Sequence, residues 1–230
     1  MFNILTLNKI SKVGLDKLDP AKYTCSDSVE APDAILVRSA SMHEMTLSPA
    51  TLAIGRAGAG VNNIPVADFG AQGVAVFNTP GANANAVKEL VLCSLFLASR
   101  KVASAVDWCK TLKGEGDAVG KLVEKGKSAF AGPEILGKTL GVIGLGAIGT
   151  LVAEGAKALG MDIVGYNPKL SEERIADLTS KGIKLMSSLD ELYAASDYIT
   201  LHLPLNDSTR GMINLSLIHI SEPTRQAEIS

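Results

Sequence analysis

A glycine-rich turn between two apolar segments constrains the fold of this 230-residue chain more than any other feature. The segment 139–143 is short, apolar and rich in branched side chains, as expected of a buried strand. It leads directly into Gly144, Gly146 and Gly149. Apolar residues then recur at helical spacing as far as Gly160, which predicts a helix that ends there. A strand, turn and helix in this order predict a βαβ unit on a parallel sheet.

Each glycine of this turn has a physical task in a dinucleotide-binding fold. Gly144 permits the tight turn, Gly146 lets the backbone approach a pyrophosphate, and Gly149 lets the helix press against the strand. The free N–H groups at the start of the helix then bind phosphate oxygens, helped by the helix dipole. We therefore predict a dinucleotide site. The glycines alone leave open a flavin in place of a nicotinamide, and a turn that only packs strand on helix.

Asn167 follows the next predicted strand, at the place where such folds usually carry an acidic residue for the ribose hydroxyls. A carboxamide can hydrogen-bond a hydroxyl, but it carries no charge that repels a 2′-phosphate. The preference for NAD over NADP is therefore weakened at this position.

Elsewhere, short apolar runs alternate with amphipathic stretches, which predicts an α/β protein with parallel sheets. Helical spacing over 85–100 predicts a helix between two α/β units. The segment 110–137 is rich in Gly, Lys and Glu, and we predict an irregular surface connection there. Ser188 and Glu191 form a predicted capping box. The predicted strands are 2–7, 34–37, 52–55, 74–77, 139–143, 163–166 and 198–203.

The bulk properties exclude several classes of protein. A net charge of −2 and a pI near 5.9 give no basic face for nucleic acid or an anionic membrane, so small molecules are the expected partners. The longest apolar stretch, 90–98, is too short to span a membrane, and the first residues do not form a secretory signal. Cys25, Cys93 and Cys109 are scattered, which favours reduced cytoplasmic thiols over disulfides or a metal site.

Further motifs stand in a fixed order along the chain. They are Val37-Arg38-Ser39, the glycine-rich run 55–64, Asn78-Thr79-Pro80-Gly81, Lys88-Glu89-Leu90, 137–141, and His202-Leu203-Pro204-Leu205 with Thr209. In this order they resemble the D-isomer-specific 2-hydroxyacid dehydrogenases, and within that family the members that act on 3-phosphoglycerate. The resemblance runs from the first strand to about Asn214.

The resemblance implies a fold and an activity. A flavodoxin-like substrate domain would begin in 1–84, and a Rossmann-type NAD-binding domain would follow over 85–214, incomplete and including the bridging helix 85–100. NAD would be the cofactor, and the reaction would be the oxidation of 3-phosphoglycerate to 3-phosphooxypyruvate, the first step of L-serine biosynthesis. Relatives dimerise through the nucleotide domain, so a homodimer or higher homo-oligomer is expected.

The resemblance also assigns residues to the two ligands. A strand-end arginine beside a loop of exposed N–H groups suits a doubly anionic substrate, although a surface charge beside an ordinary turn would give the same pattern. A histidine that ends a buried strand, such as His202, is more often a satisfied structural group. The substrate-binding residues implied are Arg38, Ser39, Arg56, Gly58, Gly60 and Asn78. The cofactor-binding residues implied are Gly144, Gly146, Ala147, Ile148, Gly149, Asn167, His202, Leu203 and Pro204.

The catalytic groups themselves are missing. Oxidation of a secondary alcohol needs a base for the hydroxyl proton and a cation or donor at the carbonyl oxygen. In the family these groups are an Arg, a Glu and a His from segments downstream of the position equivalent to Asn214, so we predict no catalytic residue here. Beyond Asn214 the pattern breaks, and 215–230 looks like translated vector or adapter sequence. We expect that this tail is not native and that the chain alone folds poorly and has negligible activity.

Two other functions stay open at this point. The same fold would serve a glyoxylate or hydroxypyruvate reductase, which a phosphate-dependent substrate preference would distinguish. A non-catalytic dinucleotide-sensing protein is the alternative from another class.

Overall fold

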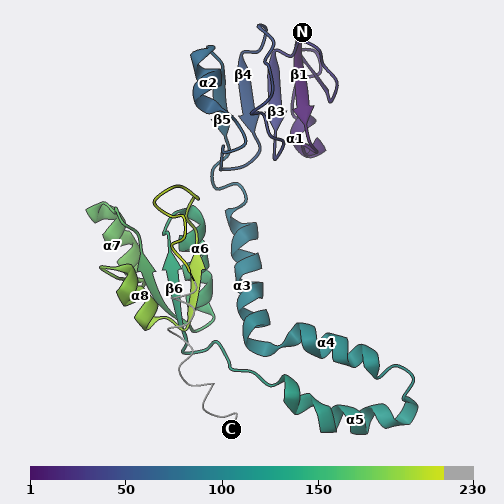
Figure 1. Ribbon diagram of the computed structural model, residues 1–230, viewed down its shortest axis with the longest axis vertical. Coiled ribbons are helices and arrows are strands. Elements are labelled where there is room, and N and C mark those ends of the chain that lie inside the picture. The colour runs from purple at the N-terminus through teal and green to yellow at the C-terminus, as the bar shows by residue number, and fades with distance from the viewer. Residues whose placement is uncertain (215–230) are drawn as a thin grey trace. The chain divides into compact units, whose positions relative to one another are not determined.

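The computed structural model describes residues 1–214, which form two compact units (Figure 1). The first unit is Met1–Cys93, and the second begins at Ser94. The division lies inside the long helix that we predicted between two α/β units. The predicted non-native tail, 215–230, lies outside the described residues.

A five-stranded parallel sheet forms the first unit. Its strand order is β2-β1-β3-β4-β5, the flavodoxin-like order, so the expected fold of this unit is confirmed. The strands are β1 (Phe2–Leu7), β2 (Tyr23–Ser26), β3 (Ala34–Val37), β4 (Ala53–Arg56) and β5 (Ala75–Asn78), and the helices are α1 (Lys12–Leu15) and α2 (Val66–Ala71).

The core of the first unit centres on β3, the middle strand. Ile35 and Val37 are buried there beside Ile54 of β4. Phe69 of α2 and Met42 pack against the same cluster. These apolar contacts fix β3 and β4, whose carboxyl ends carry the predicted arginines.

The segment between the two sheets is helical. Helix α3 (Ala84–Arg100) confirms the helix expected over 85–100. Helix α4 (Val102–Thr111) follows α3. The irregular connection predicted over 110–137 is wrong in part, because this segment contains further helices, which are η1 (Gly116–Ala118), α5 (Val119–Gly126) and η2 (Lys127–Phe130).

Aromatic packing explains why this segment folds. The ring centroids of Trp108 and Phe130 lie 5.0 Å apart, and this contact joins α4 to η2. A Cβ on Gly126 would lie 2.4 Å from Trp108, so the absence of a side chain lets α5 close against the indole. Gly114 and Gly116, with φ of 99° and 50°, supply the turn between α4 and α5. We call residues 102–130 the helical arm (Figure 1).

A four-stranded parallel sheet forms the second unit in the order β8-β7-β6-β9. This is the order of the first four strands of a Rossmann sheet, as expected. The strands are β6 (Thr139–Ile143), β7 (Asp162–Tyr166), β8 (Lys184–Leu185) and β9 (Tyr198–Leu201), and the helices are α6 (Ala147–Ala158), α7 (Glu172–Ser180) and α8 (Leu189–Ala195).

Helices α6 and α8 cover opposite faces of this sheet. A Cβ on Gly141 would meet Leu192 of α8, whereas Val142, the next residue, points toward Gly149 of α6. Residues 140–143 of β6 are buried throughout, as expected of a parallel strand covered on both sides. None of the helices within residues 1–214 combines the length and the apolar character that a membrane crossing requires.

Candidate functional site

The glycine-rich turn lies between β6 and α6, where the two elements press together. A Cβ on Gly149 would lie 1.9 Å from the carbonyl oxygen of Gly144, so this position admits no side chain. Gly144 has a φ of 92° and lies against the backbone of His202, where a Cβ would come within 2.6 Å of the carbonyl oxygen. Both glycines are therefore required by close backbone approaches. This matches the tasks that the sequence assigned to them.

Gly146 differs from the other two glycines because the space beside it is open. A Cβ built there would meet nothing within 4 Å, and Gly146 and Ala147 are both exposed. Among the described residues, no backbone or side-chain acceptor is found for the N–H groups of Gly146, Ala147 and Ile148. Several free donors beside open space at the start of a 12-residue helix fit an anionic diphosphate.

The remaining predicted cofactor residues gather at the same edge of the sheet. Strands β7, β6 and β9 are neighbours, and Asn167, Gly144 and His202 follow their carboxyl ends. The N–H of Leu145 donates to Asn167 Oδ1 at 3.4 Å. Leu203 and Pro204 follow His202, and the Leu203 side chain reaches Gly144. The fold thus brings all the predicted cofactor residues together.

His202 is a half-buried group with defined partners. Its backbone N–H donates to the Ile143 carbonyl at 2.8 Å, and its ring Nε2 lies 3.0 Å from Thr200 Oγ1. Burial lowers the pKa of His202 below the ordinary value of 6.5. The imidazole is therefore neutral near pH 7, and it contributes hydrogen bonding rather than charge at this edge of the sheet.

The predicted substrate residues follow β3, β4 and β5, which are adjacent strands. Arg56 ends β4, and its Nε donates to the carbonyl oxygen of Arg38, just beyond β3, at 3.1 Å. Asn78 ends β5, and its side-chain amide donates to the Ala59 carbonyl at 2.7 Å. Gly58 has a φ of 153° and lies so close to the Arg56 guanidinium that any side chain there would collide with it.

These contacts join the carboxyl ends of β3, β4 and β5 and the loop 57–60 into one surface, which we call the rim. The Arg38 and Ser39 side chains, Gly60 and Asn78 are exposed on it, and Arg56 is half-buried. A cavity of about 170 Å³ lies beside this rim, with Arg56, Asn78 and Thr79 among its lining residues. Two arginines and open backbone can bind an anion.

Asn8 holds this rim and was missed by the sequence reasoning. Its Oδ1 accepts the N–H groups of Ser39 at 3.0 Å and Ala40 at 2.6 Å. Asn8 has a φ of 67°, a conformation that asparagine tolerates better than most residues. Its position just after β1, a neighbour of β3, is the signal that would have placed it at the same edge.

The family model described as D-isomer specific 2-hydroxyacid dehydrogenase, NAD binding domain, matches residues 92–224. The chain belongs to this family. The family model is that of an NAD-binding domain, so NAD is the cofactor that the family assigns to the second unit.

Curated relatives carry two different names. D-3-phosphoglycerate dehydrogenase of Mycobacterium tuberculosis is 38% identical over 199 residues, which are 85% of this chain and 35% of that protein. Hydroxypyruvate reductase of Thermotoga maritima is 40% identical over 185 residues, 79% of this chain and 55% of that protein. The chain thus spans about a third of the length of the phosphoglycerate dehydrogenases that it matches.

Solved structures of other proteins share the fold. D-mandelate dehydrogenase of Rhodotorula graminis matches with a TM-score of 0.71 at 20% identity, over 94% of this chain and 70% of that one. The NAD⁺-bound 3-phosphoglycerate dehydrogenase of Entamoeba histolytica matches with a TM-score of 0.69 at 25% identity, over 95% of this chain and 68% of that one.

Proposed function

We propose that this chain binds NAD and 3-phosphoglycerate and serves the oxidation of that alcohol to 3-phosphooxypyruvate. The observation that carries the proposal is the pair of arginines on adjacent strand ends, with Arg56 Nε tied to the Arg38 carbonyl. 3-Phosphoglycerate carries two anionic groups, a carboxylate and a phosphate. Guanidinium groups bind both anions through paired hydrogen bonds, so two of them on one rim suit such a substrate.

The glycine turn would hold the cofactor. The N–H groups of Gly146, Ala147 and Ile148, which have no acceptor within residues 1–214, would donate to the pyrophosphate, and Asn167 would hydrogen-bond the adenine ribose. Leu203 and Pro204 would lie under the nucleoside. Bound NAD would accept the hydride from the alcohol carbon.

The names of the relatives support this substrate without excluding another. The phosphoglycerate dehydrogenase of M. tuberculosis is 38% identical, but the hydroxypyruvate reductase of T. maritima is 40% identical. Reduction of hydroxypyruvate, which carries one anionic group and no phosphate, is therefore the second candidate function. The two functions differ in how much binding depends on the substrate phosphate.

Calorimetric titration of the NAD-loaded chain with 3-phosphoglycerate, glycerate and hydroxypyruvate tests the proposal. We expect 3-phosphoglycerate to bind most tightly and Arg38→Ala to weaken it at least about tenfold, since a charged hydrogen bond contributes about 1.5–3 kcal/mol. Lys22→Ala removes an exposed cation from the opposite end of the sheet and should leave binding unchanged. Equal affinity for all three acids, or no effect of Arg38→Ala, would favour the reductase.

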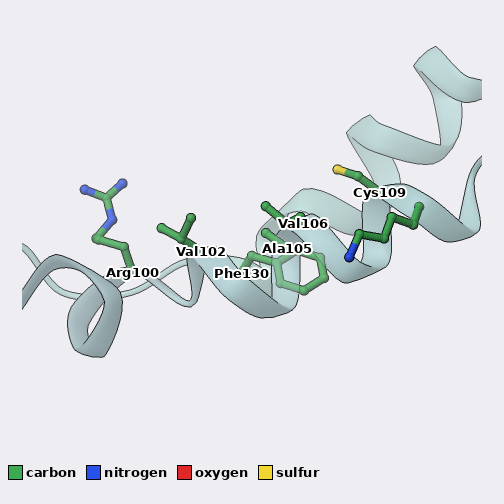
Figure 2. Close-up of a pocket in the computed structure, with 7 residues that line it drawn as sticks. Arg100, Val102, Ala105, Val106, Cys109 and Phe130 are labelled. Carbon is green, nitrogen blue, oxygen red and sulfur yellow. The ribbon is translucent and has the colours of Figure 1, made fainter. Parts of the chain in front are cut away.

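A second copy of the chain is the proposed partner. Helices α4 and α5 have no buried residue, and Val102 and Val106 are 43% and 50% exposed. Figure 2 shows Val102, Ala105 and Val106 along one side of α4, with the Phe130 ring beside them. They line an open groove of about 540 Å³. An apolar helix face of this kind suits a symmetric contact between identical arms.

The proposed compartment is the cytoplasm. Cys25, Cys93 and Cys109 are all free thiols, and the last two are exposed. Exposed free thiols persist where glutathione and thioredoxin keep them reduced.

A further inference from the structure

Leu145, the residue between the first two glycines of the turn, has both of its backbone polar groups held by side chains. Its N–H donates to Asn167 Oδ1 at 3.4 Å. Its carbonyl oxygen accepts from Thr150 Oγ1 at 3.3 Å and from Arg174 Nη2 at 3.1 Å. The Leu145 side chain is buried against Gly165 of β7, so the whole residue is immobilised.

Arg174 reaches this carbonyl from another helix. It lies in the first turn of α7, three residues after the N-cap Ser171, and nothing in the sequence pattern joins it to the turn. Its Nη2 also donates to Thr150 Oγ1 at 2.6 Å, and its Nη1 pairs with Asp177. Three acceptors therefore fix the guanidinium plane, and Thr150 is both an acceptor for Arg174 and a second donor to Leu145.

The planar peptide bond transmits this constraint to Gly146. The carbonyl of Leu145 and the N–H of Gly146 belong to one trans peptide, so they point in opposite directions. Holding the carbonyl toward α7 turns the Gly146 N–H away from α7. Gly146 has no side chain that would restrain it, and the space where its Cβ would lie is open.

We propose that Arg174 is a positioning residue of the dinucleotide site: by holding the Leu145 carbonyl, it sets the direction of the Gly146 N–H that receives a diphosphate oxygen. The inference rests on the proposed binding of NAD at the glycine turn. Preorganised donors bind an anion more tightly than mobile ones, because the cost of ordering them is met when the protein folds. The contribution of Arg174 is thus made through Gly146 rather than by contact with the cofactor.

A merely structural role for Arg174 would make a different prediction. If the side chain only docks α7, any change that weakens α7 should act like its removal. Ser171→Ala provides this comparison, because it removes the cap on the Arg174 N–H and leaves the guanidinium contacts in place. Thr150→Val tests the opposite case, in which the cap of α7 is unchanged but the hold on the Leu145 carbonyl is weakened. It keeps the shape of the side chain and removes the hydroxyl that bridges Arg174 and Leu145.

The experiment measures the Kd of the full chain for NAD and ADP-ribose by calorimetry, the melting temperature, and the ¹⁵N order parameter of the Gly146 amide without ligand. We expect Arg174→Ala to raise both Kd values about tenfold, the effect of losing one charged hydrogen bond. The order parameter should fall from about 0.85 toward 0.6 or below. Thr150→Val should act in the same direction, and Arg174→Lys should recover part of the affinity. Ser171→Ala should lower the melting temperature alone.

The outcomes separate this inference from the proposed function. If the unmodified chain binds no dinucleotide, the proposed function fails, and the Gly146 order parameter alone decides the role of Arg174. If it binds NAD, unchanged affinity and an unchanged order parameter in both Arg174→Ala and Thr150→Val overturn the inference. An equal loss of affinity in Ser171→Ala also overturns it, because the effect would then come from α7 as a whole.

Discussion

The carbonyl oxygen of Gly144 occupies the place where a side chain on Gly149 would begin, 1.9 Å from an ideal Cβ. Gly149 is thus the point at which α6 presses on the end of β6. We predict that Gly149→Ala lowers the free energy of unfolding by about 3 kcal/mol, the upper range for overpacking, because backbone rather than a flexible side chain must move. Urea denaturation of the full chain measures this loss.

Gly146→Ala is the matched comparison, because the same methyl group would enter open space. We predict nearly unchanged stability and weaker NAD binding, since the methyl group would occupy the approach of the pyrophosphate. Calorimetry with NAD and denaturation of the same sample measure the two effects. Wild-type affinity in Gly146→Ala would contradict the placement of the diphosphate at this turn.

His202 predicts a pH dependence of stability. Burial lowers its pKa in the folded chain below 6.5, so between the two pKa values the unfolded chain binds the proton more readily. The buried neutral side chain of His202 therefore contributes fully to folding stability above pH 6.5, and this contribution is lost as the pH falls through the lowered pKa of the folded chain. Because glutamine does not titrate, the His202→Gln variant should lose less stability than the unmodified chain between about pH 7.5 and about pH 5.

Denaturation curves at the two pH values measure this difference. His43→Gln is the control, because it removes a histidine whose ring bonds the Asn62 carbonyl in the first unit and leaves His202 in place. The control should keep the full loss at low pH. If His202→Gln and His43→Gln behave alike, burial of His202 is not the cause.

The long buried strands could be predicted because their apolar runs are unambiguous. Strands β1, β3 and β6 have the bounds that the pattern predicts, and β4 and β5 are displaced by one residue. Strands β2 and β8 were not predicted. The first reads Tyr-Thr-Cys-Ser and the second has two residues, so neither shows an apolar run, and each lies at a sheet edge where partial exposure permits polar side chains.

The helical arm shows how glycines misled the prediction. Gly114, Gly116 and Gly120 suggested an irregular segment, but only the first two form the turn. Gly126 instead makes room for the Trp108 ring, a tertiary contact that no local pattern reveals. The capping box was predicted well, since Ser188 accepts the Glu191 N–H, although the Glu191 carboxylate bonds Ser187 rather than the cap residue.

The strand-end site residues could be predicted and the residues that hold them could not. Arg38, Arg56 and Asn78 in the first unit and Asn167 in the second follow apolar runs, and parallel strands bring such residues to the carboxyl edge of their own sheet. Arg174 lies on helix α7, and its hydrogen bonds to Leu145 and Thr150 form only once α7 is packed beside the turn. Motif spacing identifies the turn, whereas its support is visible only in three dimensions.

Asn167 predicts a change in cofactor selectivity. Its Oδ1 accepts the Leu145 N–H, a bond that an aspartate would keep, so Asn167→Asp should preserve the glycine turn while losing the bond from Asn167 Nδ2 to the Lys169 carbonyl. A carboxylate would accept the ribose hydroxyls of NAD and repel the 2′-phosphate of NADP. We predict a rise of about tenfold or more in the ratio of NADP to NAD dissociation constants, equivalent to about 1.4 kcal/mol. Parallel titrations with both cofactors measure the ratio, and an unchanged ratio would place the ribose elsewhere.

The helical arm predicts self-association that a single charge should abolish. Val106 is 50% exposed in the groove on α4, so an aspartate there would be solvated in a monomer and buried in a contact between two arms. We expect sedimentation to find a dimer for the unmodified chain and a monomer for Val106→Asp, with lower fluorescence anisotropy of Trp108, the single tryptophan. Val13→Asp is the matched control, because Val13 is 74% exposed and belongs to the first unit rather than to the arm. Because the control introduces the same charge, a monomer in both variants would show that charge alone, and not the α4 groove, governs association.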